Sequence, residues 1–111
     1  MMKESRYRQM RMLIFYDLPN NTKIDTKNYN KFHKFLIKNG YYMVQYSIYC
    51  KLCLNYDEVN KNNNKIELNK PPKGNIRILI ITEKQYESIK ILVGNKSHQE
   101  KYMTTKTVLE L

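Results

Sequence analysis

Asp17 is the residue whose position points most directly to chemistry. It follows the unbroken apolar run of residues 12–16, and no other acidic residue lies between Glu4 and Asp25. A carboxylate at the end of a strand can cap the next loop, or it can bind a divalent metal ion. One carboxylate rarely holds Mg²⁺ alone, so the metal interpretation requires a second Asp17 brought close by a two-fold axis. Both interpretations stay open on the residues alone.

The cysteines and histidines are a weaker candidate for a site. Cys50 and Cys53 form a C-x-x-C pair, and the chain also has His33 and His98. Structural zinc sites need two close ligand pairs, whereas these histidines are 65 residues apart. Residues three apart on a strand also point to opposite faces. We therefore expect two half-buried thiols and no zinc, and we interpret His33 as a residue at the edge of an apolar helix face.

The charge of the chain favours a polyanionic partner. The formal net charge is +10, of which residues 1–56 carry +7. A bias toward A/T-rich codons would add lysines, but it would not remove acidic residues. Nucleic acid is the commonest intracellular polyanion. The candidate phosphate contacts are four lysines in one stripe of a predicted helix and three N-terminal arginines: Lys27, Lys31, Lys34, Lys38, Arg6, Arg8 and Arg11.

The stripe of lysines belongs to the clearest predicted helix, over residues 25–39. Asp25 is placed to cap it, and Gly40 follows where a left-handed residue ends many helices. Tyr29, Phe32 and Leu36 share the opposite, apolar stripe. No Glu precedes any of the four lysines by four residues, so nothing on the helix neutralises them. Such a stripe is either a solvated face or a surface for phosphates.

The remaining pattern alternates strands and helices. Residues 9–18 and 75–82 are predicted as central strands, because both of their faces are apolar. Residues 41–54 are rich in Tyr, Val and Ile, and a turn near Ser47 would split them into two strands. A helix is predicted from Asn55, with Glu58 completing a capping box, to before Pro71. Residues 83–87 form a short helical connection, and Ser88–Val93 a last short strand.

This order predicts an α+β fold, a ferredoxin-like βαββαβ sandwich with an extra C-terminal strand. Residues 1–94 form the domain, including the extra edge strand, and residues 95–111 a polar tail. Both helices would cover one face of the sheet, yet the other face is equally apolar, so we expect a homodimer. No stretch is long and apolar enough for a membrane helix or a signal peptide, which predicts a cytoplasmic protein without membrane contact.

Several blocks of the sequence resemble one known family. Residues 11–19 (RMLIFYDLP) resemble the opening strand of the small CRISPR-associated proteins of the Cas2 family. Residues 34–40, 43–51, 70–74 and 82–86 match further blocks in order, the last two in the form found in type II CRISPR systems. The resemblance implies a ferredoxin-like homodimer that works with the CRISPR integrase to acquire new spacer DNA. It also implies a Mg²⁺-dependent endoribonuclease, with Asp17 as the catalytic residue and metal ligand.

Three functions therefore compete. The first is a dimeric scaffold that binds double-stranded DNA with the integrase in antiviral defence, and we rank it first. The second is a metal-dependent nuclease that cleaves RNA or DNA by itself through Asp17. The third is an RNA-recognition module, which would need exposed aromatics in a glycine-containing strand motif. No predicted strand contains that motif, since the glycines are Gly40, Gly74 and Gly94.

Overall fold

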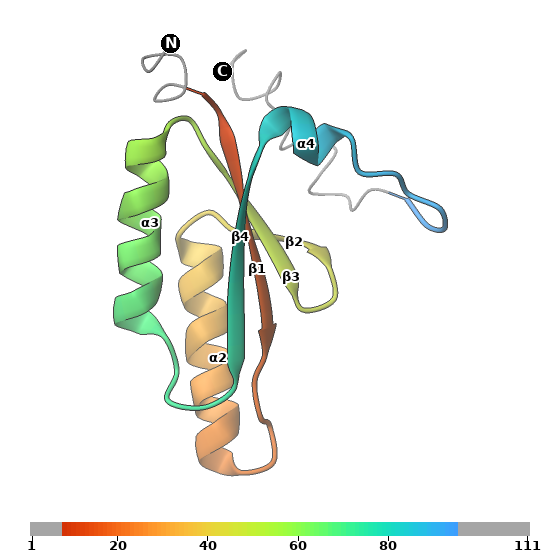
Figure 1. Ribbon diagram of the computed structural model, residues 1–111. Helices are drawn as coiled ribbons and strands as arrows, with labels where there is room; N and C mark the ends of the chain where they lie inside the picture. The colour runs from red at the N-terminus through yellow and green to blue at the C-terminus, as the bar shows by residue number, and fades with distance from the viewer. Residues whose placement is uncertain (1–7, 96–111) are drawn as a thin grey trace.

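The computed structural model describes residues 8–95 and contains one four-stranded antiparallel sheet with helices on both sides (Figure 1). The strands lie in the order β2-β3-β1-β4. This is the expected ferredoxin-like arrangement. Its elements in chain order are β1 (Met10–Asp17), α2 (Lys23–Lys38), β2 (Tyr42–Gln45), β3 (Ile48–Cys53), α3 (Tyr56–Asn69), β4 (Asn75–Thr82) and α4 (Glu83–Glu87).

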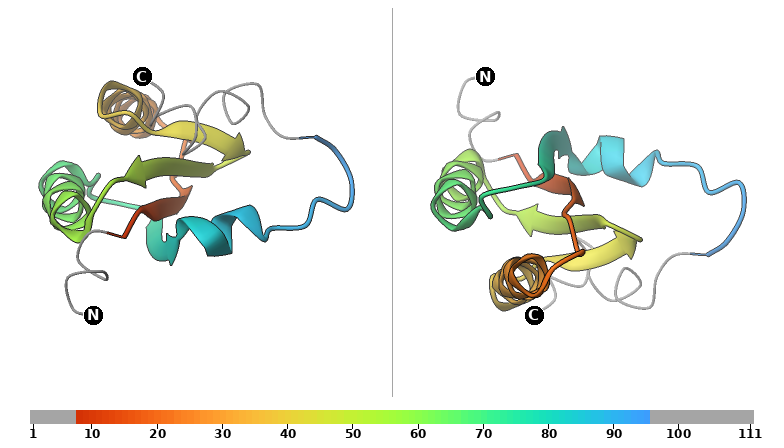
Figure 2. Two further views of the ribbon diagram at one scale, coloured as in Figure 1. Left: turned by 90° about the horizontal axis from the view of Figure 1, so that it is seen from above. Right: turned by 90° about the horizontal axis from the view of Figure 1, so that it is seen from below.

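Strand β1 lies in the middle of the sheet and divides its side chains between two layers. Its even-numbered residues, from Met10 to Tyr16, are buried with Phe32 and Leu36 of α2 and Val59 and Ile66 of α3. Figure 2 shows α2 and α3 together on that side of the sheet. The odd-numbered residues of β1 face the other way, toward a surface that we call the open face.

Both long helices begin at a side chain that caps them. Thr22, and not Asp25 as predicted, caps α2: its Oγ1 accepts a hydrogen bond from the Asp25 backbone N–H at 3.0 Å. The cap differs from the predicted one because the helix begins earlier, at Lys23, and Asp25 therefore lies in its first turn. Asn55 caps α3 as predicted, and its Oδ1 accepts from the Glu58 N–H at 2.9 Å. The Glu58 carboxylate accepts from the Leu54 N–H instead of closing the box on Asn55.

A tight turn splits the predicted strand 41–54, as expected from the sequence. Ser47 has a φ of 64°, in the left-handed region, and separates β2 from β3. The Tyr16 backbone N–H donates to the Ser47 carbonyl at 3.1 Å. The turn is thereby fixed to the last residues of β1.

Two predictions about strands are corrected. Strand β4 lies at an edge of the sheet, not in its centre, because β1 is its one neighbour within residues 8–95. Ser88–Val93 forms no strand within residues 8–95 of the single chain, where the residues after α4 pair with no strand of the sheet. The tail beyond residue 95 lies outside the described residues.

The open face is partly covered by the chain itself. Figure 2 shows α4 and the segment after it on the side of the sheet opposite α2 and α3. Leu13, Tyr42 and Cys50 are buried there, with Phe15 and Tyr86 packed against them. Leu79 of β4 is still 48 % exposed. The apolar side chains of the open face are thus partly buried within one chain, and those at the β4 edge remain exposed.

Among residues 8–95, the helices are too short or too polar to cross a membrane.

Candidate nucleic-acid interface

The stripe of lysines on α2 is exposed along its whole length. Lys27, Lys31, Lys34 and Lys38 are all exposed, and none has a carboxylate partner within residues 8–95. The opposite side of α2 is buried through Phe32 and Leu36. We call these four lysines the α2 lysine face. It presents a row of cations fixed to a helix that packs firmly on the sheet.

The three N-terminal arginines differ in how exposed their side chains are. Arg8 is exposed, and Arg6 lies outside the described residues. The prediction of Arg11 as a phosphate contact is wrong, because its side chain is 2 % exposed and cannot reach a phosphate at the surface. It points into the open face because odd-numbered residues of β1 alternate away from the helices.

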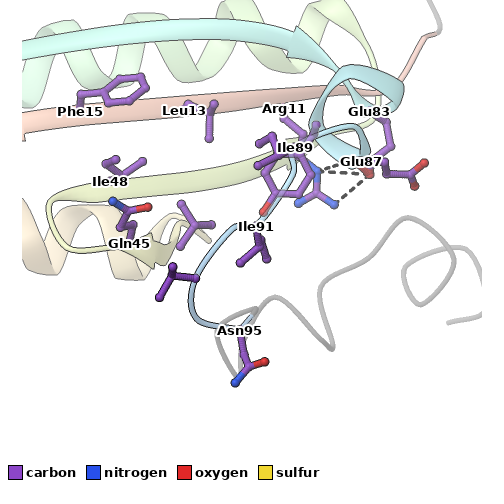
Figure 3. Close-up of a pocket in the computed structure, with 13 residues that line it drawn as sticks. Arg11, Leu13, Phe15, Gln45, Ile48, Glu83, Glu87, Ile89, Ile91 and Asn95 are labelled. Carbon is purple, nitrogen blue, oxygen red and sulfur yellow. Dashed lines mark hydrogen bonds and ion pairs between the residues drawn. The ribbon is translucent and has the colours of Figure 1, made fainter.

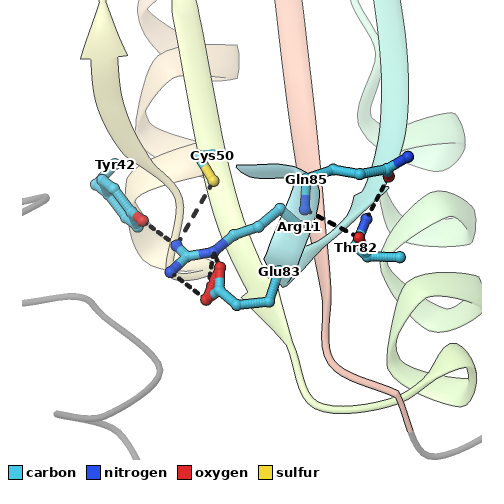
Figure 4. Close-up of polar contacts among 6 residues, drawn as sticks. All are labelled: Arg11, Tyr42, Cys50, Thr82, Glu83 and Gln85. Carbon is cyan, nitrogen blue, oxygen red and sulfur yellow. Dashed lines mark hydrogen bonds and ion pairs between the residues drawn. The ribbon is translucent and has the colours of Figure 1, made fainter. Parts of the chain in front are cut away.

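Arg11 is instead the centre of a buried polar cluster (Figure 4). Its Nε donates to Glu83 Oε1 at 2.7 Å and Nη2 to Oε2 at 2.9 Å, a two-pronged ion pair. Nη1 donates to the hydroxyl of Tyr42 and to Cys50 Sγ. The guanidinium carbon also lies 4.4 Å from the ring centre of Tyr86. The cluster joins β1, β2 and β3 to α4.

The cluster keeps Arg11 charged. Burial alone would lower the pKa of Arg11, but the hydrogen bond to Glu83 and the neighbouring Tyr42 and Cys50 raise it above its ordinary value. The pKa of the Cys50 thiol is raised by burial, although Arg11 opposes this shift. Neither group is therefore set up as a base or a nucleophile.

An apolar cavity of about 560 Å³ lies beside the cluster on the open face (Figure 3). Leu13 and Phe15 of β1 form part of its floor, and Ile89 and Ile91 lie across from them. The residues after α4 thus line one side of the cavity and remain largely exposed, with Ile89 at 55 % and Ile91 at 45 %.

A second hollow of about 410 Å³ lies at Asp17, at the end of β1. Asp17 is exposed there. The hollow is lined from β1, the β2–β3 turn and β4 by these residues: Phe15, Tyr16, Asp17, Ser47, Ile48, Asn75 and Arg77. Gly74 makes the close approach of β4 possible, because a Cβ on it would lie 2.8 Å from the Asp17 carbonyl oxygen. Asp17 can be singled out from the sequence, but Arg77 cannot, because it reaches the hollow only through the pairing of β4 with β1.

The oxygen donors of this hollow suit Mg²⁺ in kind. Asp17, Ser47 and Asn75 line it, and their side chains carry the hard oxygen atoms that Mg²⁺ prefers as ligands. Within residues 8–95, however, no group of three or more His, Cys, Asp or Glu side chains comes together. Among the described residues, Asp17 is the one carboxylate that lines the hollow, which fits a weak site completed by substrate phosphate or by a second copy.

The two cysteines lie on opposite faces of β3. Cys50 is buried on the open face and Cys53 in the core beneath the helices. Burial raises the pKa of Cys53 to about 11. His33 is half-buried, with Nδ1 3.1 Å from the Tyr49 hydroxyl, and His98 lies outside the described residues. The sequence predicts half-buried thiols, whereas the structure buries both completely, at 0 % exposed.

Comparisons with known proteins agree with this fold. The family model described as "CRISPR associated protein Cas2" matches residues 10–89. A "CRISPR-associated endoribonuclease Cas2" of Acidovorax ebreus (strain TPSY) is 42 % identical over 92 residues, covering 83 % of this chain and 90 % of the relative. One of the same name from Ligilactobacillus salivarius (strain UCC118) is 38 % identical over 100 residues, covering 90 % and 99 %.

A solved structure shows the same fold at low sequence identity. "Crystal structure of cas2" matches with a TM-score of 0.56 at 16 % identity, covering 81 % of this chain and 92 % of the other. The family model spans β1 to α4 and includes both Asp17 and the α2 lysine face. The chain belongs to the Cas2 family of CRISPR-associated proteins.

Proposed function

We propose that this protein is a dimeric scaffold of CRISPR adaptation. In the cytoplasm it holds double-stranded DNA, together with the CRISPR integrase, while new spacers are acquired in antiviral defence. The observation that carries this proposal is the α2 lysine face, whose four cations are exposed and have no carboxylate partner in residues 8–95.

The geometry of α2 suits contact with a duplex backbone. At 1.5 Å per residue, the stripe from Lys27 to Lys38 is about 16 Å long, which is the rise of about five base pairs. A straight helix surface with a single sign of charge attracts phosphates without reading bases. Such contact supports a scaffold that must accept DNA of any sequence.

Replacing the four lysines of the α2 lysine face by Gln tests this proposal. We expect much weaker duplex binding and an unchanged fold, because the four side chains point away from the core. The slope of log affinity against log salt should become shallower by about 0.9 for each phosphate that the variant no longer neutralises. Binding is measured by fluorescence anisotropy at several salt concentrations, and folding by circular dichroism.

A matched variant separates a specific face from the loss of net charge. Lys61, Lys65, Lys84 and Lys90 are also exposed but lie on α3, on α4 and after it. Their replacement by Gln removes the same four charges and should weaken binding far less. Equal losses of affinity in both variants would mean that net charge, not the α2 lysine face, attracts the DNA.

The integrase partnership has its own experiment. Pull-down of the cognate integrase with a DNA duplex should succeed with both the wild type and Asp17→Ala, because a scaffold does not need the carboxylate. Failure of the wild type to retain the integrase would contradict the scaffold role.

The second candidate is a Mg²⁺-dependent endoribonuclease. It is favoured by the exposed Asp17 in a hollow of oxygen donors and by the names of the relatives. A bound Mg²⁺ would polarise a phosphodiester and lower the pKa of water. Asp17 would hold the ion, and a two-fold copy would supply the second carboxylate.

Asp17→Asn tests this candidate, because it keeps the shape and removes the charge. Any Mg²⁺-dependent cleavage of RNA or DNA should disappear, while dimerisation and duplex binding remain. Normal cleavage by the variant would make Asp17 a loop cap. A wild type that never cleaves, with spacer acquisition intact in Asp17→Asn, would leave the scaffold as the function.

A further inference from the structure

We infer that Lys51 of β3 is a positioning residue for duplex binding, which acts through the C-terminal end of α2 and not through a phosphate of its own. The inference rests on the proposed duplex contact of the α2 lysine face and names a residue outside that face. The ammonium of Lys51 holds the end of the helix, and the last turn of the helix carries Lys38.

The C-terminal end of α2 is the part of the helix that most needs support. The last four carbonyls of a helix have no partner inside it, and this end carries about half a negative charge. Like charges four residues apart also destabilise a helix. The α2 lysine face contains two such pairs, Lys27 with Lys31 and Lys34 with Lys38. Other groups must therefore keep the last turn from fraying in the free protein.

The backbone that follows α2 satisfies two of these carbonyls. The Gly40 N–H donates to the Ile37 carbonyl at 3.2 Å, and the Tyr41 N–H donates to the Leu36 carbonyl at 3.0 Å. This is the Schellman arrangement, which favours a left-handed residue at the position of Gly40, and the φ of Gly40 is 88°. The carbonyl of Asn39 is not part of this arrangement and takes its donor from another element.

Lys51 supplies that donor. Its Nζ donates to the Asn39 carbonyl oxygen at 2.9 Å and lies 5.8 Å from the ring centre of Tyr41. A Cβ on Gly40 would lie 2.8 Å from the same Nζ, so the glycine leaves the space that the ammonium occupies. A cation at this end of a helix offsets the negative end of its dipole, and a charge-assisted hydrogen bond is stronger than a neutral one. The contact thereby fastens the end of α2 to the sheet.

This contact bears on DNA binding because Asn39 directly follows Lys38 in the chain. A face that is already ordered in the free protein does not have to be ordered when the duplex binds, which improves affinity. The ammonium also neutralises a helix end that would repel a nearby phosphate. Removal of the Lys51 ammonium should therefore weaken duplex binding although all four lysines of the α2 lysine face remain.

Lys51→Met removes the ammonium and keeps an apolar stem. We expect the affinity for a blunt DNA duplex to fall about three- to tenfold, the range for a cation at a partly buried helix end. Lys51→Arg keeps a cation with donors and should retain the affinity to within about twofold. Lys90→Met removes one exposed cation after α4 and should also change the affinity by less than about twofold. Fluorescence anisotropy measures binding, and circular dichroism confirms that each variant is folded.

The salt dependence distinguishes a positioning residue from a phosphate contact. Lys51→Met should leave the slope of log affinity against log salt unchanged, whereas loss of a direct contact would reduce it by about 0.9. In the variant with the four lysines of the α2 lysine face replaced by Gln, Lys51→Met should cause no further loss, because both changes act on the same contact. A reduced slope, or a further loss in that variant, would assign Lys51 a phosphate of its own and overturn the inference.

Amide hydrogen exchange reports on the helix end itself. The amides of residues 37–41 should exchange faster in free Lys51→Met than in the free wild type, and duplex DNA should restore their protection, because the two equilibria are linked. The amides of α3 should exchange at the wild-type rate in the variant.

The outcome for the inference is separate from the outcome for the scaffold. Wild-type duplex affinity of Lys51→Met, with weakened binding in the four-Gln variant, would overturn the inference and leave the scaffold standing. Wild-type affinity of the four-Gln variant would contradict the proposed DNA contact, and the role of Lys51 with it.

Discussion

Arg11 and Glu83 form a buried ion pair between β1 and α4, with side chains 2 % and 12 % exposed. Removing one partner of such a pair leaves an uncompensated charge, which typically costs about 3–5 kcal/mol. Glu83→Gln keeps an acceptor, so we expect the free energy of unfolding to fall by about 2–3 kcal/mol. Urea denaturation measures this change.

The ion pair between Glu67 and Lys70 is the matched control. Its side chains are 71 % and 56 % exposed, and exposed pairs contribute about 1 kcal/mol at most. Glu67→Gln should therefore leave the free energy of unfolding nearly unchanged. If Glu83→Gln lowered the free energy of unfolding no more than Glu67→Gln, the stability of the Arg11 cluster would not depend on the Glu83 carboxylate.

The cysteine thiols give a prediction with a clear pH dependence. Burial raises the pKa of Cys53 to about 11 and raises that of Cys50, so both are protonated at pH 8 in the folded chain. A thiol-specific disulfide reagent should react with neither thiol in the native protein and with both after unfolding. The unfolded state binds fewer protons above pH 9, so this contribution to stability is full below pH 9 and is lost as the pH rises toward 11. Rapid native labelling at pH 8 would contradict the burial of both thiols.

Residue patterns predict some of these roles and not others. The separation of Cys50 and Cys53 onto two faces follows from strand alternation alone. The same alternation directs Arg11 into the open face, but its burial depends on Glu83, 72 residues away in the chain. Sequence spacing carries no signal for such a pair, so the prediction of Arg11 as a phosphate contact is wrong.

At the scale of elements, the connection into β4 shapes the hollow. Gly74 has a φ of 106°, and a Cβ there would lie 2.6 Å from Leu18 Cδ2 and 2.8 Å from the Asp17 carbonyl oxygen. Gly74→Ala therefore adds a clash with backbone to the left-handed penalty of about 1–2 kcal/mol. We expect a loss of more than about 2 kcal/mol in the free energy of unfolding. Urea denaturation measures this change.

Gly94 provides the control for that substitution. Its φ is 96°, but a Cβ would meet nothing within 4 Å. Gly94→Ala carries only the backbone penalty and should lower the free energy of unfolding less than Gly74→Ala does. Equal losses of stability in the two variants would mean that backbone conformation, not crowding against Asp17, decides the effect.

The elements themselves can largely be predicted because their signals are local. The alternating strands, the cap at Asn55 and the split at Ser47 all depend on residues close in sequence. The position of β4 at the sheet edge does not depend on local residues alone. A central strand and an edge strand that pairs with another chain have the same apolar pattern. The same ambiguity applies to Ser88–Val93, whose apolar pattern forms no strand in the described part of the single chain and would suit pairing with a second copy.

At the scale of the whole molecule, the edge of β4 and the open face call for a partner. Strand β4 pairs only with β1 within residues 8–95, and an unpaired edge exposes backbone donors and acceptors. Leu79 on this strand is 48 % exposed, and Ile89 and Ile91 after α4 are 55 % and 45 % exposed. A second copy that places its Ser88–Val93 along β4 would satisfy the edge and bury these side chains.

We therefore predict a dimer, with a mass in sedimentation equilibrium of twice the 13.5 kDa of the chain at micromolar concentration. Leu79→Lys should dissociate it, because the charge would be buried in the interface. Leu68→Lys on α3, where Leu68 is 84 % exposed, should leave it intact. The amides of residues 89–93 should exchange slowly in the dimer and quickly in the Leu79→Lys monomer, because strand pairing protects them. A well-folded wild type that sediments as a monomer would contradict the two-fold arrangement, and with it the pairing of two Asp17 carboxylates on one Mg²⁺.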